Sequence, residues 1–90
     1  MTRAMAIEIA PDVRVNCVCP GYVDTDMIRR TNKLRSDPEA AWQKMVDYAP
    51  LKRITTPAEI AAGILYLASD DARFVTGVAL PIDGGTTAGH

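Results

Sequence analysis

Residues 13–25 read VRVNCVCPGYVDT, and this stretch decides the fold. Apolar or small side chains recur there at every second position: Val13, Val15, Cys17 and Cys19. This period of two predicts a buried strand over residues 13–19. Pro20 then lacks an amide hydrogen and Gly21 lacks a side chain, so the strand should end in bare backbone. Open α/β folds bind ligands at such carboxyl ends, where the Thr25 hydroxyl is also expected.

The neighbouring segments predict three helices. Residues 2–10 are expected to form the end of a helix that Pro11 stops. Residues 36–39 (SDPE) place a capping residue before a proline. The apolar face of the helix that they open is Trp42, Met45, Val46 and Ala49. Residues 56–59 (TPAE) form a capping box, in which Thr56 and Glu59 bond each other's amides.

The last part of the chain predicts a second strand. The helix after the capping box has a wide apolar face suited to a sheet: Ile60, Ala61, Ile64, Leu65, Leu67 and Ala68. A turn at Thr76-Gly77 precedes a strand over 78–82, and Asp83-Gly84-Gly85 forms the final turn. The two strands and the helix make a βαβ unit, expected to be right-handed. The small, polar tail 86–90 is expected to fray.

Residues 24–35 form a polar segment, and we expect it to belong to a lid. Its cations are Arg29, Arg30, Lys33 and Arg35. They could attract an anionic substrate or a cofactor phosphate. The net charge of −1 favours the alternative that they form the solvated face of a mobile lid.

Composition narrows the class of protein. Ninety residues with 48% hydrophobic content suit one small domain, although so short a chain buries little surface. The near-zero charge argues against nucleic acid or membrane partners, and no apolar run is long enough to span a bilayer. We expect a cytoplasmic protein. Cys17 and Cys19 are expected to be small buried hydrophobes in a reducing compartment, and no metal site is predicted.

Taken in order, these motifs resemble the short-chain dehydrogenase/reductase family. The segments that carry the resemblance are MAIEIAP (5–11), RVNCVCPG (14–21), PLKR (50–53), TPAEI (56–60), LASD (67–70), VTGV (75–78) and DGG (83–85). Only about residues 29–48 stay unmatched. The resemblance implies an α/β fold in which this chain is the terminal βαβ part of a Rossmann-like, doubly wound parallel sheet, preceded by a helix.

The resemblance also implies an NAD(P)-dependent oxidoreductase that reduces a carbonyl or oxidises an alcohol on a small molecule. The residues that it places at the nicotinamide end of NAD or NADP are Pro20, Gly21, Val23 and Thr25. In the family the backbone around Val23 bonds the carboxamide, and the threonine hydroxyl bonds the carboxamide or the pyrophosphate. Tyr22 and Met27 would belong to the substrate lid. On the residues alone, the alternative is an ordinary strand-ending turn with Thr25 capping a helix.

The family's Gly-rich turn and its catalytic Ser and Tyr-x-x-x-Lys are not found in this sequence. We therefore expect residues 1–90 to be the carboxyl-terminal part of a single NAD(P)-binding domain, inactive alone and without a catalytic residue of its own. Tyr48 and Lys52 have the Tyr-x-x-x-Lys spacing, but Pro50 between them should end the helix that the mechanism needs.

The resemblance further implies a homo-oligomer when the segment is part of a full-length chain. The apolar face over 60–68 suits a subunit contact, and it suits the chain's own sheet equally well. The alternative function is non-catalytic: a truncated product that acts only as a packing or interaction fragment, or as one half of a split reductase. Such a fragment would expose a strand edge and apolar surface.

Overall fold

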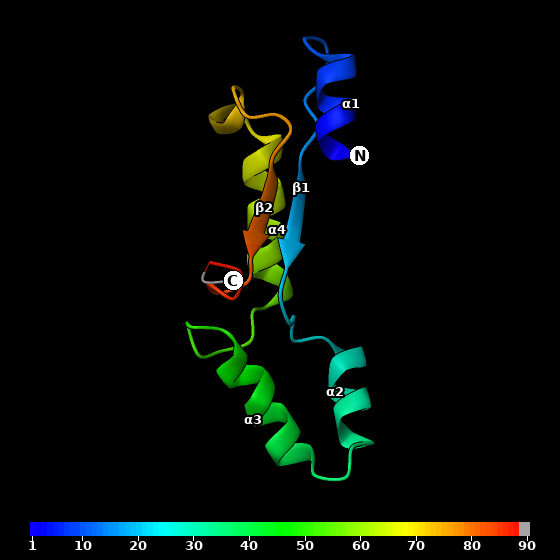
Figure 1. The fold of residues 1–90 in the computed structure, drawn as a ribbon, viewed down its shortest axis with the longest axis vertical. Coiled ribbons are helices and arrows are strands. Elements are labelled where there is room, and N and C mark those ends of the chain that lie inside the picture. The colour runs from blue at the N-terminus through cyan, green and yellow to red at the C-terminus, as the bar shows by residue number, and fades with distance from the viewer. Residues whose placement is uncertain (89–90) are drawn as a thin grey trace.

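The computed structural model describes residues 1–88, which form six labelled elements and one short 3-10 turn (Figure 1). In chain order they are α1 (Thr2–Ile9), β1 (Cys17–Pro20), α2 (Asp26–Lys33), α3 (Pro38–Tyr48), α4 (Pro57–Ala68), the 3-10 turn Asp70–Ala72 and β2 (Ala79–Ile82). The strands and α4 lie together in what we call the sheet unit. α2 and α3 form the helical pair beyond the carboxyl ends of the strands.

The two strands are parallel, as the βαβ prediction requires. Cys17 pairs with Ala79 and Pro20 pairs with Ile82. α4 covers one face of this sheet. The contact is close at Gly63, where a Cβ atom would collide with the Ile82 side chain. The absence of a side chain at Gly63 therefore lets the helix approach the strand closely.

The first strand begins later than predicted. Residues 13–16 are not part of β1, because side chains replace the regular ladder there. The Asn16 amide group donates to the Val75 carbonyl at 3.0 Å, and its Oδ1 accepts from the Val78 amide at 3.0 Å. The Val15 amide donates to the Thr76 hydroxyl at 3.0 Å. A regular parallel ladder becomes possible only from Cys17 onward.

Pro20 is the last residue of β1, one position beyond the predicted end of the strand. The amides of Cys17 and Gly21 both donate to β2, to the carbonyls of Val78 and Ile82. Alternate residues of a strand direct their backbone groups to opposite sides, so the Pro20 nitrogen faces the outer edge of β1. No ladder hydrogen bond is lost there, which is why the proline is tolerated.

The predicted helix signals are confirmed at α1, α3 and α4. The Asp37 carboxylate accepts from the Ala40 amide at 3.3 Å and begins α3. Thr56 and Glu59 form the reciprocal capping box of α4. No helix was predicted in the polar segment, where residues 26–33 form α2. Its sequence is mainly polar, so no apolar stripe revealed it.

Only α4 covers the sheet, so its other face is open within residues 1–88. Cys19, Ala79 and Pro81 lie on that face and are exposed. The prediction of two buried cysteines was therefore wrong: Cys17 is half-buried and Cys19 is exposed, and both are free thiols.

None of the helices described here is long and apolar enough to cross a membrane. The prediction of a fraying tail falls partly on residues 89–90, which lie outside the described residues.

Candidate functional site

The carboxyl ends of β1 and β2 converge at Gly21. Its amide donates to the Ile82 carbonyl at 3.2 Å. A Cβ at position 21 would lie 3.2 Å from both Cα and Cβ of Asp83, which is closer than a normal contact. Gly21 is therefore needed for the chain to pass β2, and the Pro-Gly pair directs the next residues across the end of the sheet.

Residues 22–24 are held in an extended conformation by the loop that precedes α4. The Thr55 amide donates to the Tyr22 carbonyl at 3.2 Å, and the Asp24 amide donates to the Thr55 carbonyl at 2.8 Å. Val23 thereby forms an isolated parallel bridge with Thr55. Because backbone groups alternate along extended chain, the amide and carbonyl of Val23 point away from Thr55. Neither has a hydrogen-bond partner among residues 1–88.

Thr25 caps α2, as the alternative interpretation of this residue predicted. Its Oγ1 accepts from the Ile28 amide at 3.3 Å. An accepting hydroxyl still has a hydrogen to donate, so capping and ligand binding are compatible. Met27, predicted to belong to the lid, lies on α2 and is mostly exposed. It lines neither of the two hollows that lie beside α3, which are described next.

A hollow of about 500 Å³ lies between the strand ends, the end of α3 and the loop before α4. Its apolar and aromatic wall comes from Tyr22, Met45, Tyr48, Pro50, Leu51, Pro81 and Ile82. A second hollow of about 490 Å³ follows α3 toward its start, and includes Arg35 and Lys44. The two hollows share Tyr22, Met45 and Tyr48. The Tyr22 and Tyr48 rings meet edge to face, with centroids 5.9 Å apart.

The charged groups of the first hollow are held by contacts within the chain. Arg53 donates twice to Glu59, at 2.6 and 2.5 Å. These hydrogen bonds, with the Thr56 amide, lower the pKa of Glu59 from 4.5 to about 2. The Thr87 hydroxyl donates to Asp83 at 2.7 Å and lowers the pKa of that carboxyl. Arg53 and Glu59 therefore neutralise each other, whereas Asp83 stays a carboxylate that accepts hydrogen bonds from its own turn. The rest of the wall is mainly apolar.

In the structure, the four cations of the predicted basic cluster have different surroundings. Arg29 donates to the Asp24 carboxylate at 2.6 and 2.7 Å, and its guanidinium lies 5.2 Å from the centre of the Trp42 ring. Its charge is therefore used to hold the helical pair together. Arg35 lines the second hollow instead, while Arg30 and Lys33 line neither hollow. Arg35 and Lys44 make no side-chain hydrogen bond or ion pair within the described chain.

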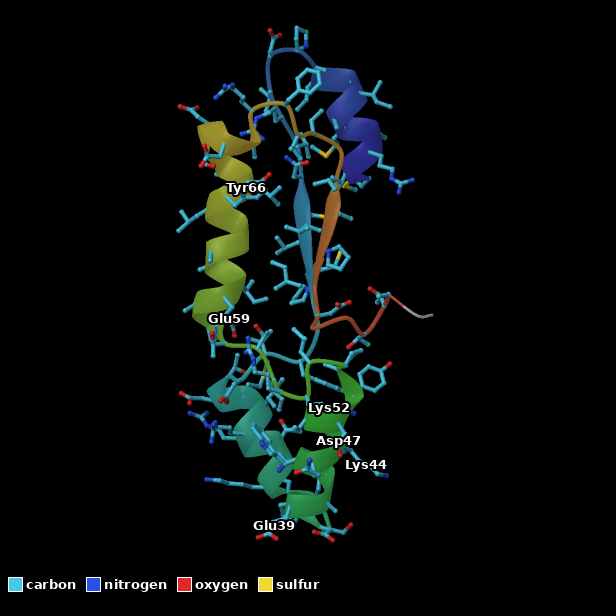
Figure 2. The ribbon with its side chains drawn as sticks, turned by 90° about the vertical axis from the view of Figure 1, so that its left-hand side faces the viewer. Glu39, Lys44, Asp47, Lys52, Glu59 and Tyr66 are labelled. Carbon is cyan, nitrogen blue, oxygen red and sulfur yellow. The ribbon has the colours of Figure 1, made fainter. Side chains whose placement is uncertain are left out.

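The tyrosine–lysine spacing at 48–52 does not form an acid–base pair. α3 ends at Tyr48, and Lys52 follows Pro50 with a positive φ of 59°. The Lys52 ammonium donates to the Asp47 carbonyl at 3.0 Å (Figure 2). No group of three or more His, Cys, Asp or Glu side chains that could hold a metal ion occurs in residues 1–88.

Sequence reasoning missed the two hollows and the Thr55 bridge. Both join segments that are far apart in the chain, so no local pattern indicates them. The Asp24–Arg29 pair could have been found from its spacing of five residues around a threonine cap. That spacing is not the i, i+3 or i, i+4 spacing of helix pairs, so it would have carried little weight alone.

Comparison with known proteins gives a consistent result. Residues 1–87 match the family described as enoyl-(acyl carrier protein) reductase. The chain is 41% identical over 91 residues to the 3-oxoacyl-[acyl-carrier-protein] reductase MabA of Mycobacterium tuberculosis, covering 100% of this chain and 34% of that protein. It is 48% identical over 88 residues to galactitol 2-dehydrogenase (L-tagatose-forming) of Cereibacter sphaeroides, covering 97% and 33%.

Solved structures give the same fold. A short-chain dehydrogenase family protein from Francisella tularensis superposes with a TM-score of 0.89 at 40% identity, covering 98% of this chain and 39% of that one. The aldohexose dehydrogenase of Thermoplasma acidophilum gives 0.87 at 36% identity, covering 97% and 36%. The chain spans about a third of the length of the curated relatives it matches. Its fold is the Rossmann-like α/β fold of these dehydrogenases, and the chain belongs to the short-chain dehydrogenase/reductase family.

Proposed function

We propose that this chain contributes the nicotinamide-side wall and the substrate lid of an NAD(P)-dependent oxidoreductase acting on a small carbonyl or alcohol. The relatives are oxidoreductases, which supports the class of reaction. On the motifs that it resembles, we propose that the chain belongs to the carboxyl-terminal part of the fold. The wall consists of Pro20, Gly21, Val23 and Thr25, and the lid contains Tyr22 and Met27.

The observation that carries this proposal is the backbone of Val23. A nicotinamide carboxamide has an NH2 donor and a carbonyl acceptor on the same planar group. The Val23 carbonyl and amide, which Thr55 leaves available, offer the complementary acceptor and donor. Because the Thr55 bridge fixes this backbone in advance, little entropy is lost on binding. A bound nicotinamide would supply or accept the hydride.

Thr25 has a second, separable role in this proposal. Its hydroxyl accepts from the Ile28 amide, and its hydrogen donates to the carboxamide or pyrophosphate of the cofactor. Pro20 and Gly21 direct the chain so that Val23 and Thr25 lie beyond the same strand end. The general acid would come from residues outside this chain, which is therefore inactive alone.

Position 25 allows a direct test in the intact protein. T25S keeps both the cap and the donor, whereas T25D keeps an accepting cap and removes the donor. NADH or NADPH, whichever the unchanged protein binds, should bind T25D at least fivefold more weakly and T25S almost normally. ADP-ribose lacks nicotinamide, so its affinity serves as the control. Equal weakening of dinucleotide and ADP-ribose would move the Thr25 contact from the carboxamide to the pyrophosphate, which both ligands contain. No weakening of either would contradict a cofactor contact at Thr25.

A second candidate is a non-catalytic packing partner or half of a split reductase. The open sheet face with exposed Cys19, Ala79 and Pro81 favours it. Intact mass and amino-terminal sequencing of the protein from its native source decide between the two. A native product that is this chain alone and binds no dinucleotide would favour the second candidate. A longer product that contains these residues would favour the first.

A further inference from the structure

The two adjoining hollows differ in character, although they share one wall. The first is mainly apolar: Arg53 is paired with Glu59, and the Asp83 carboxylate accepts hydrogen bonds from Thr87 and nearby amides. The second has two cations, Arg35 and Lys44, that have no anionic partner in the described structure. One side of this double hollow therefore favours hydrocarbon and the other favours an anion.

α3 sets the distance between these two parts. Ala41, Lys44, Met45 and Tyr48 follow the i, i+3, i+4, i+7 spacing and line the hollows from one face of the helix. Lys44 and Tyr48 are one turn apart, which corresponds to about 6 Å along the axis. A ligand that crosses the Met45 and Tyr48 wall would therefore place its anionic end about one helical turn from its apolar body.

One carboxylate, that of Asp37, also lines the second hollow. It accepts from the Ala40 amide at 3.3 Å as the cap of α3. Its lone pairs are thus partly occupied, and the hollow still has one more cation than anion. Ser36 adds a hydroxyl donor beside Arg35. The local charge and hydrogen-bonding groups suit one carboxylate or phosphate.

We propose that the double hollow binds an elongated amphipathic anion, with its apolar chain against Tyr22, Met45 and Tyr48 and its anionic group between Arg35 and Lys44. As the substrate class of the oxidoreductase, this proposal rests on the proposed function. Binding itself requires no cofactor, so it is tested separately. The hollows, each close to 500 Å³, are in the size range of small-molecule sites.

The probes are octanoate and 1-octanol, which have the same chain length and differ in charge. Amide shifts of the ¹⁵N-labelled intact protein report both the affinity and the place of binding. Octanoate should shift the signals of Tyr22, Met45 and Tyr48, and should bind more tightly than 1-octanol. Butanoate should bind much more weakly, because it cannot fill the apolar hollow and reach the cations together.

Matched charge variants test the anionic half. Arg35 and Lys44 are exposed, so the double variant R35A/K44A is expected to fold. It should weaken octanoate binding roughly fivefold and leave 1-octanol unchanged, as expected for two exposed charge contacts. R30A/K33A removes the same charge from α2, outside the hollows, and should change neither ligand. Y48A, at the shared wall, should weaken both.

Three results would overturn the proposal. Equal affinity for octanoate and 1-octanol would reject the anionic end. Equal weakening by R30A/K33A and R35A/K44A would show a general charge effect. Absence of shifts at Tyr22, Met45 and Tyr48 with millimolar octanoate would reject the site itself. Dinucleotide binding with the T25D pattern would persist in each case, so the proposed function would stand or fall separately.

Discussion

The sheet unit and the helical pair are held together in different ways. In the sheet unit, the Arg14 guanidinium donates to the carbonyls of Leu67, Val75 and Ser69, at 2.8, 3.0 and 3.4 Å. These contacts join residues more than fifty positions apart. In the helical pair, the Asn32 amide group donates to the Pro38 carbonyl at 2.9 Å, only six positions away. Long-range closure costs more chain entropy and gives a more cooperative structure.

This difference has a consequence for function. The Val23 backbone is fixed by Thr55, on the sheet unit's side of the site. The Arg35 and Lys44 side chains belong to the locally formed helices and are exposed. Segments with local contacts open at lower free energy than cooperative cores. The proposed cofactor wall should therefore be rigid, and the proposed lid should be adaptable.

The largest expected effect is on the sheet unit. Arg14→Ala removes a charged donor from three carbonyls and should lower the free energy of unfolding by about 2–3 kcal/mol. Urea denaturation monitored by circular dichroism measures the change. Arg30→Ala removes the same side chain from α2 and should stay within about 0.5 kcal/mol. Similar losses for both variants would contradict the comparison between the two regions.

The helix caps sharpen the comparison. Thr56→Ala removes the cap of α4, which packs on β1, and should cost about 1–2 kcal/mol. Asp37→Ala removes the cap of α3 and should cost about 0.5–1 kcal/mol, because α3 belongs to the locally held pair. Thermal melts of both variants compare the two losses. A larger loss for Asp37→Ala would mean that α3 is coupled to the global fold.

The sequence predicted elements whose signals are local. The caps at Asp37 and Thr56 and the apolar faces after them predicted α3 and α4, and the Pro-Gly pair predicted the strand-ending turn. α2 was missed because Thr25 was its main signal and its faces carry few apolar residues. The first half of the strand was predicted wrongly because the Asn16 side chain, bonded to Val75 and Val78, takes the place of the ladder.

The candidate site was predictable in part. Val23 and Thr25 could be named from motif order, but their cofactor role stays a prediction. That Thr55 orients the Val23 backbone could not be predicted, since it depends on contact between segments thirty-two positions apart in sequence. The double hollow likewise requires α3, β2 and the loops that follow β1, α3 and β2 to converge. The capping box fixed the start of α4, but nothing local fixed where the preceding loop would cross the sheet.

A smaller effect concerns the contact between α2 and α3. Arg29→Lys keeps the charge but loses the paired hydrogen bonds to Asp24 and the planar stacking over Trp42. The helices should loosen without unfolding of the sheet unit. Acrylamide quenching of Trp42 fluorescence should rise on the order of twofold, whereas Arg30→Lys should leave it unchanged. Unchanged quenching in Arg29→Lys would mean that other contacts hold the pair.

The smallest expected effect is an acid-dependent change at the start of α4, where Glu59 lies (Figure 2). The Arg53 guanidinium and the Thr56 amide hold the folded-state pKa of Glu59 at about 2, below the ordinary 4.5. A lowered folded pKa means that the unfolded chain binds the proton first. The stabilisation is therefore complete above about pH 4.5 and is lost as the pH falls through about 2.

Acid unfolding curves of paired variants separate this contribution from the rest. Glu59→Gln should remove the part of the stability loss that falls between pH 4.5 and 2, because position 59 no longer titrates. Glu39→Gln changes a first-turn carboxylate of α3 that makes no ion pair within residues 1–88. This variant should keep the loss of stability between pH 4.5 and 2. If both variants reduced this loss of stability equally, the acid response would reflect the overall charge of the protein. Since Arg53 and Glu59 also line the apolar hollow, protonation of Glu59 should leave the Arg53 cation there without its anion. Octanol affinity should then fall over the same pH interval.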